Sequence, residues 1–120
     1  MTVRAIRGAT TASIDSKEEI ELVVTELMRE ILSVNKLQEE DLISVLFTAT
    51  KDLRSIFPAS AARVLGFGDT PLICAQELDI EGALPRTIRV LVHVQSSREK
   101  SEIVHVYLRD AVVLRKDLSR

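Results

Sequence analysis

The residues of this chain that could do chemistry are cations set among apolar neighbours. Arg7 stands beside Gly8 at the end of an apolar stretch, and Arg89 interrupts the aliphatic run Ile88–Val94. Three further candidates stand in other segments: Arg63, Tyr107 and Arg115. An arginine in so apolar a strand is rarely buried without an anionic partner. The pattern therefore predicts either salt bridges to some of the 18 acidic residues or a site for a small dicarboxylate or phosphate.

Several standard catalytic motifs are absent from the sequence. It has no glycine-rich phosphate loop, no HExxH, no CxxC and no GxSxG. One cysteine and two histidines make a poor set of metal ligands, so we expect neither a metal nor a cofactor. His93 and His105 are expected on strands, as packed residues rather than catalytic bases.

Composition limits the class of protein. A length of 120 residues and a mass of 13.4 kDa suit one domain, residues 1–120. The content of 46% hydrophobic and 28% charged residues excludes a disordered tail. A net charge of -2 gives no support to nucleic acid or an anionic membrane as partner. No apolar run could span a membrane and no signal peptide opens the chain, so we expect a cytoplasmic protein. A mean hydropathy of +0.13 with only 3% aromatics indicates either a buried subunit interface or a Val/Leu-rich core.

The N-terminal half contains three segments with clear periodicity. Thr2–Arg7 alternates as a short strand that Gly8–Thr11 should break. Ser16 followed by Glu19 forms a capping-box pattern, and apolar spacings of three and four then predict an amphipathic helix of about five turns. Leu42–Thr50 is apolar on both faces, which predicts a central strand covered on both sides.

The C-terminal half predicts mainly strands. Pro58–Gly66 is the exception, because proline suits the first position of a helix and glycine its end. Pro71–Gln76, Arg86–Gln95 and Ile103–Leu108 predict three strands, and Leu114–Leu118 predicts a short mobile tail. This order of elements indicates an α/β sandwich, with a mixed β-sheet packed against helices.

The chain also carries a series of short sequence blocks. They are Arg4–Thr11, Phe57–Ala59, Cys74–Glu77, Ile88–Val90, His105–Leu108 and Ala111–Arg115, with Asp117–Ser119 at the end. Taken in order, these blocks resemble the small monofunctional chorismate mutases of the α/β, trimeric class. The resemblance covers essentially the whole chain, from residue 4 to residue 119.

The resemblance implies a homotrimer with a pseudo-barrel of sheets and three active sites in clefts between neighbouring subunits. It implies chorismate as substrate and prephenate as product, in the branch step toward phenylalanine and tyrosine. By matching position, Arg7, Arg89 and Tyr107 should hold the enolpyruvyl carboxylate and the ether oxygen, while Glu77 and Cys74 should meet the ring hydroxyl. The last two are three residues apart, so a bulge or strand end must lie between them.

The resemblance also implies the remaining substrate-binding positions. They are an apolar wall of Phe57, Ala59 and Leu114, cations at the mouth at Arg63 and Arg115, and further contacts at Ser60 and Ile73. The segment from Phe57 to Arg63 should come from the adjacent subunit. Ser60 replaces a lysine of the family pattern, which removes one contact with the ring carboxylate.

The chemistry of that reaction fits the residues. A unimolecular rearrangement of a dianion needs no metal, nucleotide or nucleophile, whereas it does need anchored carboxylates and a cation at the breaking bond. Two other interpretations stay open from the residues alone. One is a non-catalytic trimeric binding module for a small dicarboxylate, and the other is a structural protein whose arginines pair with acids across an interface.

Overall fold

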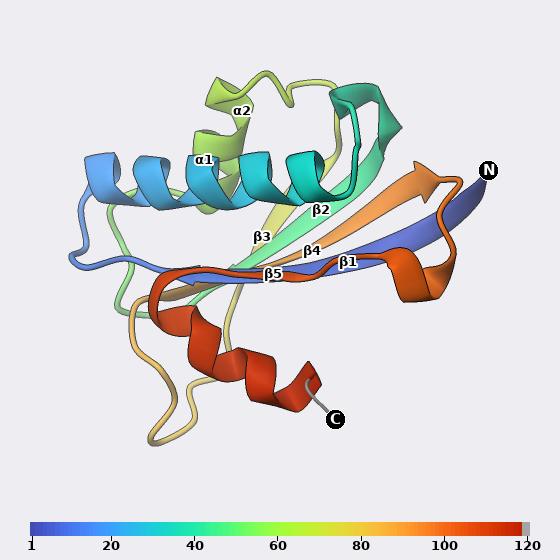
Figure 1. The fold of residues 1–120 in the computed structure, drawn as a ribbon. Coiled ribbons are helices and arrows are strands. Elements are labelled where there is room, and N and C mark those ends of the chain that lie inside the picture. Colours follow the sequence, from blue (N-terminus) through green and yellow to red (C-terminus); the bar gives the residue numbers. More distant parts are fainter. Residues whose placement is uncertain (119–120) are drawn as a thin grey trace.

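The computed structural model describes residues 1–118 and contains a mixed five-stranded sheet (Figure 1). Ser119, the last residue of the final sequence block, lies outside the described residues. The strands are β1 (Thr2–Thr11), β2 (Leu42–Ala49), β3 (Leu72–Gln76), β4 (Thr87–Ser96) and β5 (Val106–Tyr107). Their order across the sheet is β3-β2-β4-β1-β5. β4 pairs antiparallel with both β1 and β2, while the outer strands β3 and β5 pair parallel with their neighbours. The mixed sheet confirms the predicted fold class.

Two α-helices cover one face of this sheet, α1 (Lys17–Val34) and α2 (Pro58–Val64) (Figure 1). α1 buries six apolar side chains, among them Ile20, Leu27 and Ile31, against the inward residues of β4. Those inward residues are Ile88, Val90, Val92 and Val94, which are all buried as their alternation predicts. Within residues 1–118, no helix is both long enough and apolar enough to cross a membrane.

The helix ends differ in one detail from the sequence pattern. Ser16 caps α1 as predicted, its side chain accepting a hydrogen bond from the Glu19 backbone N–H. The Glu19 carboxylate does not return to Ser16 and instead accepts from the backbone and hydroxyl of Ser13, so the capping box is not closed. At α2, Pro58 occupies the first turn, and Gly66 follows the helix with a φ of +98° that favours glycine.

The other face of the sheet carries the short 3-10 helix η3 (Arg109–Leu118) (Figure 1). The tail predicted to be mobile therefore has a regular structure, because Ala111 and Leu114 pack against Tyr107 and Ala9. The α-helices cover only one face of β2, so the prediction of cover on both sides is wrong for this chain. Leu46 and Thr48 of β2 consequently remain partly exposed on the α-helix-free face.

Two strand lengths also differ from prediction, for reasons outside their own sequences. β1 does not break at Gly8 but continues to Thr11, because this segment pairs with β4 on one side and β5 on the other. β5 has only two residues, because the buried side chain of Asn35 takes both backbone groups of Val104. The Asn35 amide also donates to the Ile31 carbonyl and so joins the end of α1 to the start of β5.

Gly8 allows α1 to pack closely against β1. A Cβ at this position would lie 2.8 Å from Ile31 Cδ1 and 3.0 Å from Val90 Cγ1. These contacts are with buried side chains of α1 and β4, which have little room to move. The glycine is therefore needed for its lack of a side chain at a point where helix and sheet meet.

We expect Gly8→Ala to lower the free energy of unfolding by about 1–3 kcal/mol, the usual cost of overpacking a core. Gly68→Ala is the matched control, because nothing lies within 4 Å of a Cβ at that position. Urea denaturation would measure both variants. Equal midpoints for Gly8→Ala and the unaltered protein would contradict close packing of α1 against Gly8.

Candidate functional site

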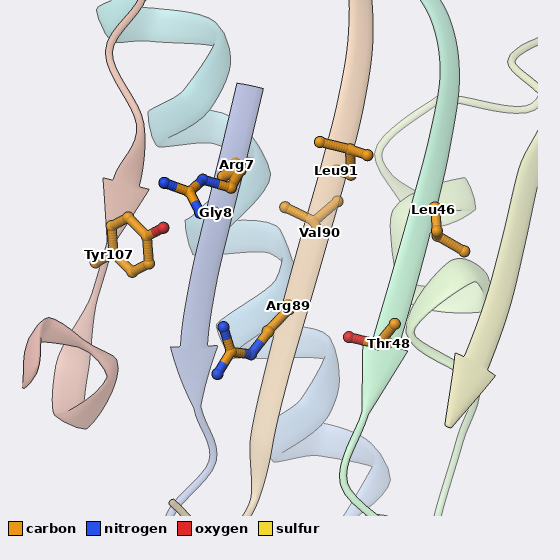
Figure 2. Close-up of a pocket in the computed structure, with 8 residues that line it drawn as sticks. All are labelled: Arg7, Gly8, Leu46, Thr48, Arg89, Val90, Leu91 and Tyr107. Carbon is orange, nitrogen blue, oxygen red and sulfur yellow. The ribbon is translucent and has the colours of Figure 1, made fainter. Parts of the chain in front are cut away.

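A pocket of about 190 Å³ lies on the face of the sheet opposite α1. Its lining residues come from four strands: Arg7, Gly8, Leu46, Thr48, Arg89, Val90, Leu91 and Tyr107. Figure 2 shows the guanidinium groups of Arg7 and Arg89 and the Tyr107 hydroxyl on this face, with α1 behind the sheet. The site thus combines two cations, a phenol and aliphatic side chains.

The register of the sheet places the polar residues of this pocket in one row. Arg89 stands opposite Thr48 of β2 and opposite Ala9 of β1. Ala9 in turn stands opposite Tyr107 of β5. Since paired residues project from the same face of a sheet, Thr48, Arg89 and Tyr107 share the pocket side. Arg7 lies two residues from Ala9 along β1, and so on the same side.

Arg89 has an acidic partner within the chain. Its Nε lies 3.5 Å from Glu77 Oε2, and the same carboxylate oxygen accepts a hydrogen bond from the Thr48 hydroxyl. The ion pair is partly open to solvent, with 46% of the Arg89 side chain and 23% of the Glu77 side chain exposed. Glu77 therefore orients the guanidinium through Nε, while no side chain of residues 1–115 takes a hydrogen bond from its two Nη atoms.

Arg7 and Tyr107 differ from Arg89 in having no such partner. Among the described residues, none forms an ion pair or hydrogen bond with the Arg7 guanidinium or the Tyr107 hydroxyl. The Arg7 side chain is exposed, whereas Tyr107 is 9% exposed with its ring packed against Ala9 and Ala111. One fixed phenol and one cation without an internal counter-charge therefore face the same pocket, as expected for a site that takes an anion.

The side chain of His105 contacts the main chain of Arg7 rather than its guanidinium. The backbone N–H of Arg7 donates to His105 Nδ1 at 2.9 Å. Burial lowers the pKa of His105 below its ordinary value, and the positive charge of Arg7 lowers this pKa further. Both effects favour a neutral imidazole. The residue lies immediately before β5 rather than within a strand, so its predicted position is wrong by one residue. His93 lies on β4, where its Nδ1 is 3.4 Å from the Ser44 hydroxyl.

The α2 segment does not reach this pocket within one chain. Phe57 precedes α2 and is 70% exposed, while Ala59, Ser60 and Arg63 lie on the helix itself. α2 covers the same face of the sheet as α1 (Figure 1), whereas Arg89 lines the pocket on the other face. Within one chain, the structure therefore separates Phe57 and Ala59 from Arg7 and Arg89.

β3 divides its predicted site residues between the two faces. Cys74 stands opposite Phe47 and packs against the helix-covered core, so it does not share the pocket of Arg89. Cys74 and Phe57 line a separate pocket of about 650 Å³ at this end of the sheet. Ile73 stands opposite Leu46, on the Arg89 side, and is 64% exposed. β3 ends at Gln76, which supplies the expected strand end before Glu77.

The η3 positions lie near Tyr107. Leu114 is half-buried against the cluster of Ala9, Tyr107 and Ala111, and Arg115 on the same helix is exposed. The predicted site residues that the structure brings together are thus Arg7, Glu77, Arg89 and Tyr107, with Leu114 packed beside them.

Five pocket residues are not among the predicted site residues: Gly8, Leu46, Thr48, Val90 and Leu91. Leu46 and Leu91 look like ordinary core residues of apolar strands, and a threonine is common in any strand. The one available signal for Thr48 is its polar side chain in a strand predicted to be covered on both faces. No group of three or more His, Cys, Asp or Glu residues within 1–118 could hold a metal ion.

Comparison with known proteins identifies relatives along almost the full chain. Residues 3–118 match the family of chorismate mutase type I. The chain is 44% identical over 120 residues to chorismate mutase AroH of Bacillus subtilis (strain 168), covering 99% of this chain and 94% of that protein. It is 46% identical over 117 residues to chorismate mutase AroH of Thermus thermophilus, covering 97% and 96%.

A solved structure agrees with these sequence matches. The chorismate mutase from Clostridium thermocellum superposes with a TM-score of 0.89 and 47% sequence identity, covering 91% of this chain and 97% of that chain. The resemblance noted in the sequence blocks is thereby confirmed over the whole fold. The chain belongs to the type I chorismate mutase family.

Proposed function

We propose that this chain rearranges chorismate to prephenate in the pocket between Arg7, Arg89 and Tyr107. The observation that carries the proposal is that all three groups line one pocket in a member of this family. Among the side chains of residues 1–115, none pairs with the Arg7 guanidinium, the Arg89 Nη atoms or the Tyr107 hydroxyl. In the reaction, the ether C–O bond breaks while a C–C bond forms between the enolpyruvyl methylene and the ring. Neither a proton nor an electron is exchanged with the protein.

Arg89 has the geometry to stabilise the transition state of this reaction. Negative charge grows on the ether oxygen as its bond to the ring stretches, so a cation fixed there binds the transition state more strongly than the substrate. The Glu77 carboxylate holds the guanidinium by Nε and leaves the Nη donors for the ligand. Thr48 in turn holds Glu77 by a hydrogen bond. The arginine is therefore oriented before substrate arrives, which lowers the reorganisation needed during reaction.

Arg7 and Tyr107 would anchor the enolpyruvyl carboxylate beside Arg89. An anchored carboxylate restricts a flexible substrate to the compact shape in which the reacting carbons meet. Glu77 would accept a hydrogen bond from the ring hydroxyl and act as counter-charge rather than as a general base. Leu46 and Leu91 would contribute apolar contacts that exclude water from the reacting centre.

The pocket is only half of a site, and we propose that a neighbouring subunit completes it in a homotrimer. Ligand pockets usually enclose about 300–1,000 Å³, more than the volume found here. Three large apolar side chains in and around edge strand β3 are 64–77% exposed: Phe57, Ile73 and Leu78. Exposed apolar patches commonly mark interfaces. The proposal places these residues of one subunit against the pocket of the next.

The neighbour would then supply the α2 side of the cleft. Its contribution would include Cys74, which lines one pocket with Phe57 in this structure. The full set proposed from the neighbour is Phe57, Ala59, Ser60, Arg63, Ile73 and Cys74. Leu114 and Arg115 on η3 of the subunit that supplies Arg7 and Tyr107 would close the mouth of the cleft. Because Ser60 has no charge, Arg63 and Arg115 would carry the electrostatic attraction for the ring carboxylate.

We expect the purified protein to convert chorismate to prephenate at an unchanged rate after treatment with a chelator. The rearrangement takes neither a metal nor a nucleotide, because it is an internal exchange of bonds. Loss of chorismate absorbance measures the rate. Binding of chorismate without conversion would favour the dicarboxylate-binding alternative, and activity that returns only with added metal would contradict the mechanism.

Arg89→Lys tests the role of the guanidinium at the breaking bond. Lysine keeps the charge but lacks the planar fork that contacts Glu77 and the ligand together. We expect kcat to fall by ~10²–10³, the usual loss for one donor of this kind, with a smaller rise in KM. Arg29→Lys, at an exposed position on α1, is the control and should keep the full rate. Near-normal kcat for Arg89→Lys would make the arginine a structural ion pair.

Subunit mixing tests the shared site. The assembly should sediment at three times the 13.4 kDa chain mass. Arg89→Lys and Phe57→Ala would each impair every cleft of their own trimer. After unfolding and refolding together in equal amounts, about a quarter of the clefts should take both sound halves and regain activity, by random assembly of a cyclic trimer. A fully active monomer, or no recovery in mixed trimers of confirmed composition, would contradict the proposal.

A further inference from the structure

Beside Arg7, the edge of β1 has no paired strand residue, because β5 contains only two residues. β5 pairs with β1 only at Gly8 and Ala9, so regular ladder bonding stops just before Arg7. The Arg7 N–H points away from β4 and toward this edge, where it meets the His105 ring. A side chain thus supplies the hydrogen bond that a longer β5 would have supplied from its backbone.

The main chain is held in place on both sides of His105. On its N-terminal side, the Val104 N–H donates to Asn35 Oδ1 at 2.8 Å, and the Val104 carbonyl accepts from Asn35 Nδ2 at 2.9 Å. Asn35 is 2% exposed, so this anchor is part of the core. On its C-terminal side, Val106 pairs with Gly8. His105 is therefore fixed in position relative to β1 before any ligand arrives.

We propose that His105 is a positioning residue for Arg7, holding the main chain of β1 so that the guanidinium stays in register with Arg89 and Tyr107. This inference rests on the proposed function, since it assigns His105 to the site that Arg7 serves. A backbone N–H can only donate, so Nδ1 must accept and the proton of the neutral ring must lie on Nε2. His105 does not line the pocket and takes no part in the bond exchange.

This backbone contact matters because, among the side chains of residues 1–115, none forms a hydrogen bond or ion pair with the Arg7 guanidinium. The place of this guanidinium, unlike that of Arg89, therefore depends on its own backbone. A substrate carboxylate bound by Arg7 is present in both ground and transition states. Loss of the restraint should therefore weaken binding more than it slows the chemical step.

Two variants of His105 separate the hydrogen bond from the presence of a ring. His105→Asn retains an acceptor near the Nδ1 position, because the asparagine side-chain oxygen replaces that atom. His105→Leu has similar bulk but no acceptor. We expect His105→Leu to lower kcat/KM at least tenfold, mainly through KM, and His105→Asn to stay within about threefold of the unaltered protein. His93→Leu is the control and should keep its activity, because His93 stands opposite Ala5 and its Nδ1 faces the Ser44 hydroxyl rather than the Arg7 N–H.

A double-mutant cycle decides whether His105 acts through Arg7. In an Arg7→Ala background, His105→Leu should lower kcat/KM by no more than twofold further, because the guanidinium it positions is gone. Equal losses in both backgrounds would overturn the inference and leave His105 a general structural residue. A loss in His105→Asn as large as in His105→Leu would overturn it as well.

Hydrogen exchange of the Arg7 amide gives a readout independent of catalysis. Exchange should be slow in the unaltered protein and in His105→Asn, and faster in His105→Leu, while the amides of β4 stay unchanged. If the protein did not convert chorismate, the proposed function would fail even with this amide protected. If it converted chorismate but the amide exchanged equally in all three proteins, the positioning inference alone would fail.

Discussion

The pairing of β4 with both of its neighbours is the constraint on which the site depends. It sets Arg89 opposite Thr48 on one side and opposite Ala9 on the other, while the alternate residues of β4 fill the core under α1. A shift by one residue would turn Arg89 into that core and expose Val90 or Ile88. The hydrophobic side of the strand thus fixes the place of the cation on the other side.

Electrostatics at the site follows from this placement. Glu77 offsets part of the charge of Arg89, yet it contacts only Nε and is held by Thr48, so its effect is largely one of orientation. Arg7 keeps its full charge without an internal partner in the described part of the chain. A dianionic ligand would therefore meet one oriented cation and one unpaired cation. Partial exposure of the ion pair means that water weakens it, which lowers the cost of sharing Arg89 with a ligand.

The sequence predicted what depends on local pattern and missed what depends on distant partners. Alternation in β4, the cap at Ser16 and the glycine after α2 could all be read from neighbouring residues. The continuation of β1 through Gly8–Thr11 could not be predicted in this way, because it depends on pairing with β4 and β5. Gly8 is present because α1 packs closely against β1 at this point. Arg7 and Arg89 stood out by type, but their roles and those of Glu77 and Tyr107 came from the family resemblance. Thr48 and His105 were missed as site residues because their importance lies in hydrogen bonds across the sheet.

The proposed assembly gives one physical reason for several otherwise separate features. A chain with 46% hydrophobic residues and 3% aromatics leaves Phe57, Ile73 and Leu78 largely exposed, while its cationic pocket lies open on the face of the sheet that the α-helices do not cover. A neighbouring subunit that covers the pocket would bury apolar surface and exclude water in the same step. Because charge–charge attraction strengthens as water leaves, the hydrophobic association would also strengthen the interaction of Arg89 with the developing charge on the ether oxygen. Subunit association and transition-state stabilisation would then depend on the same contacts, and weakening the interface would weaken catalysis even where every polar residue of the pocket remained.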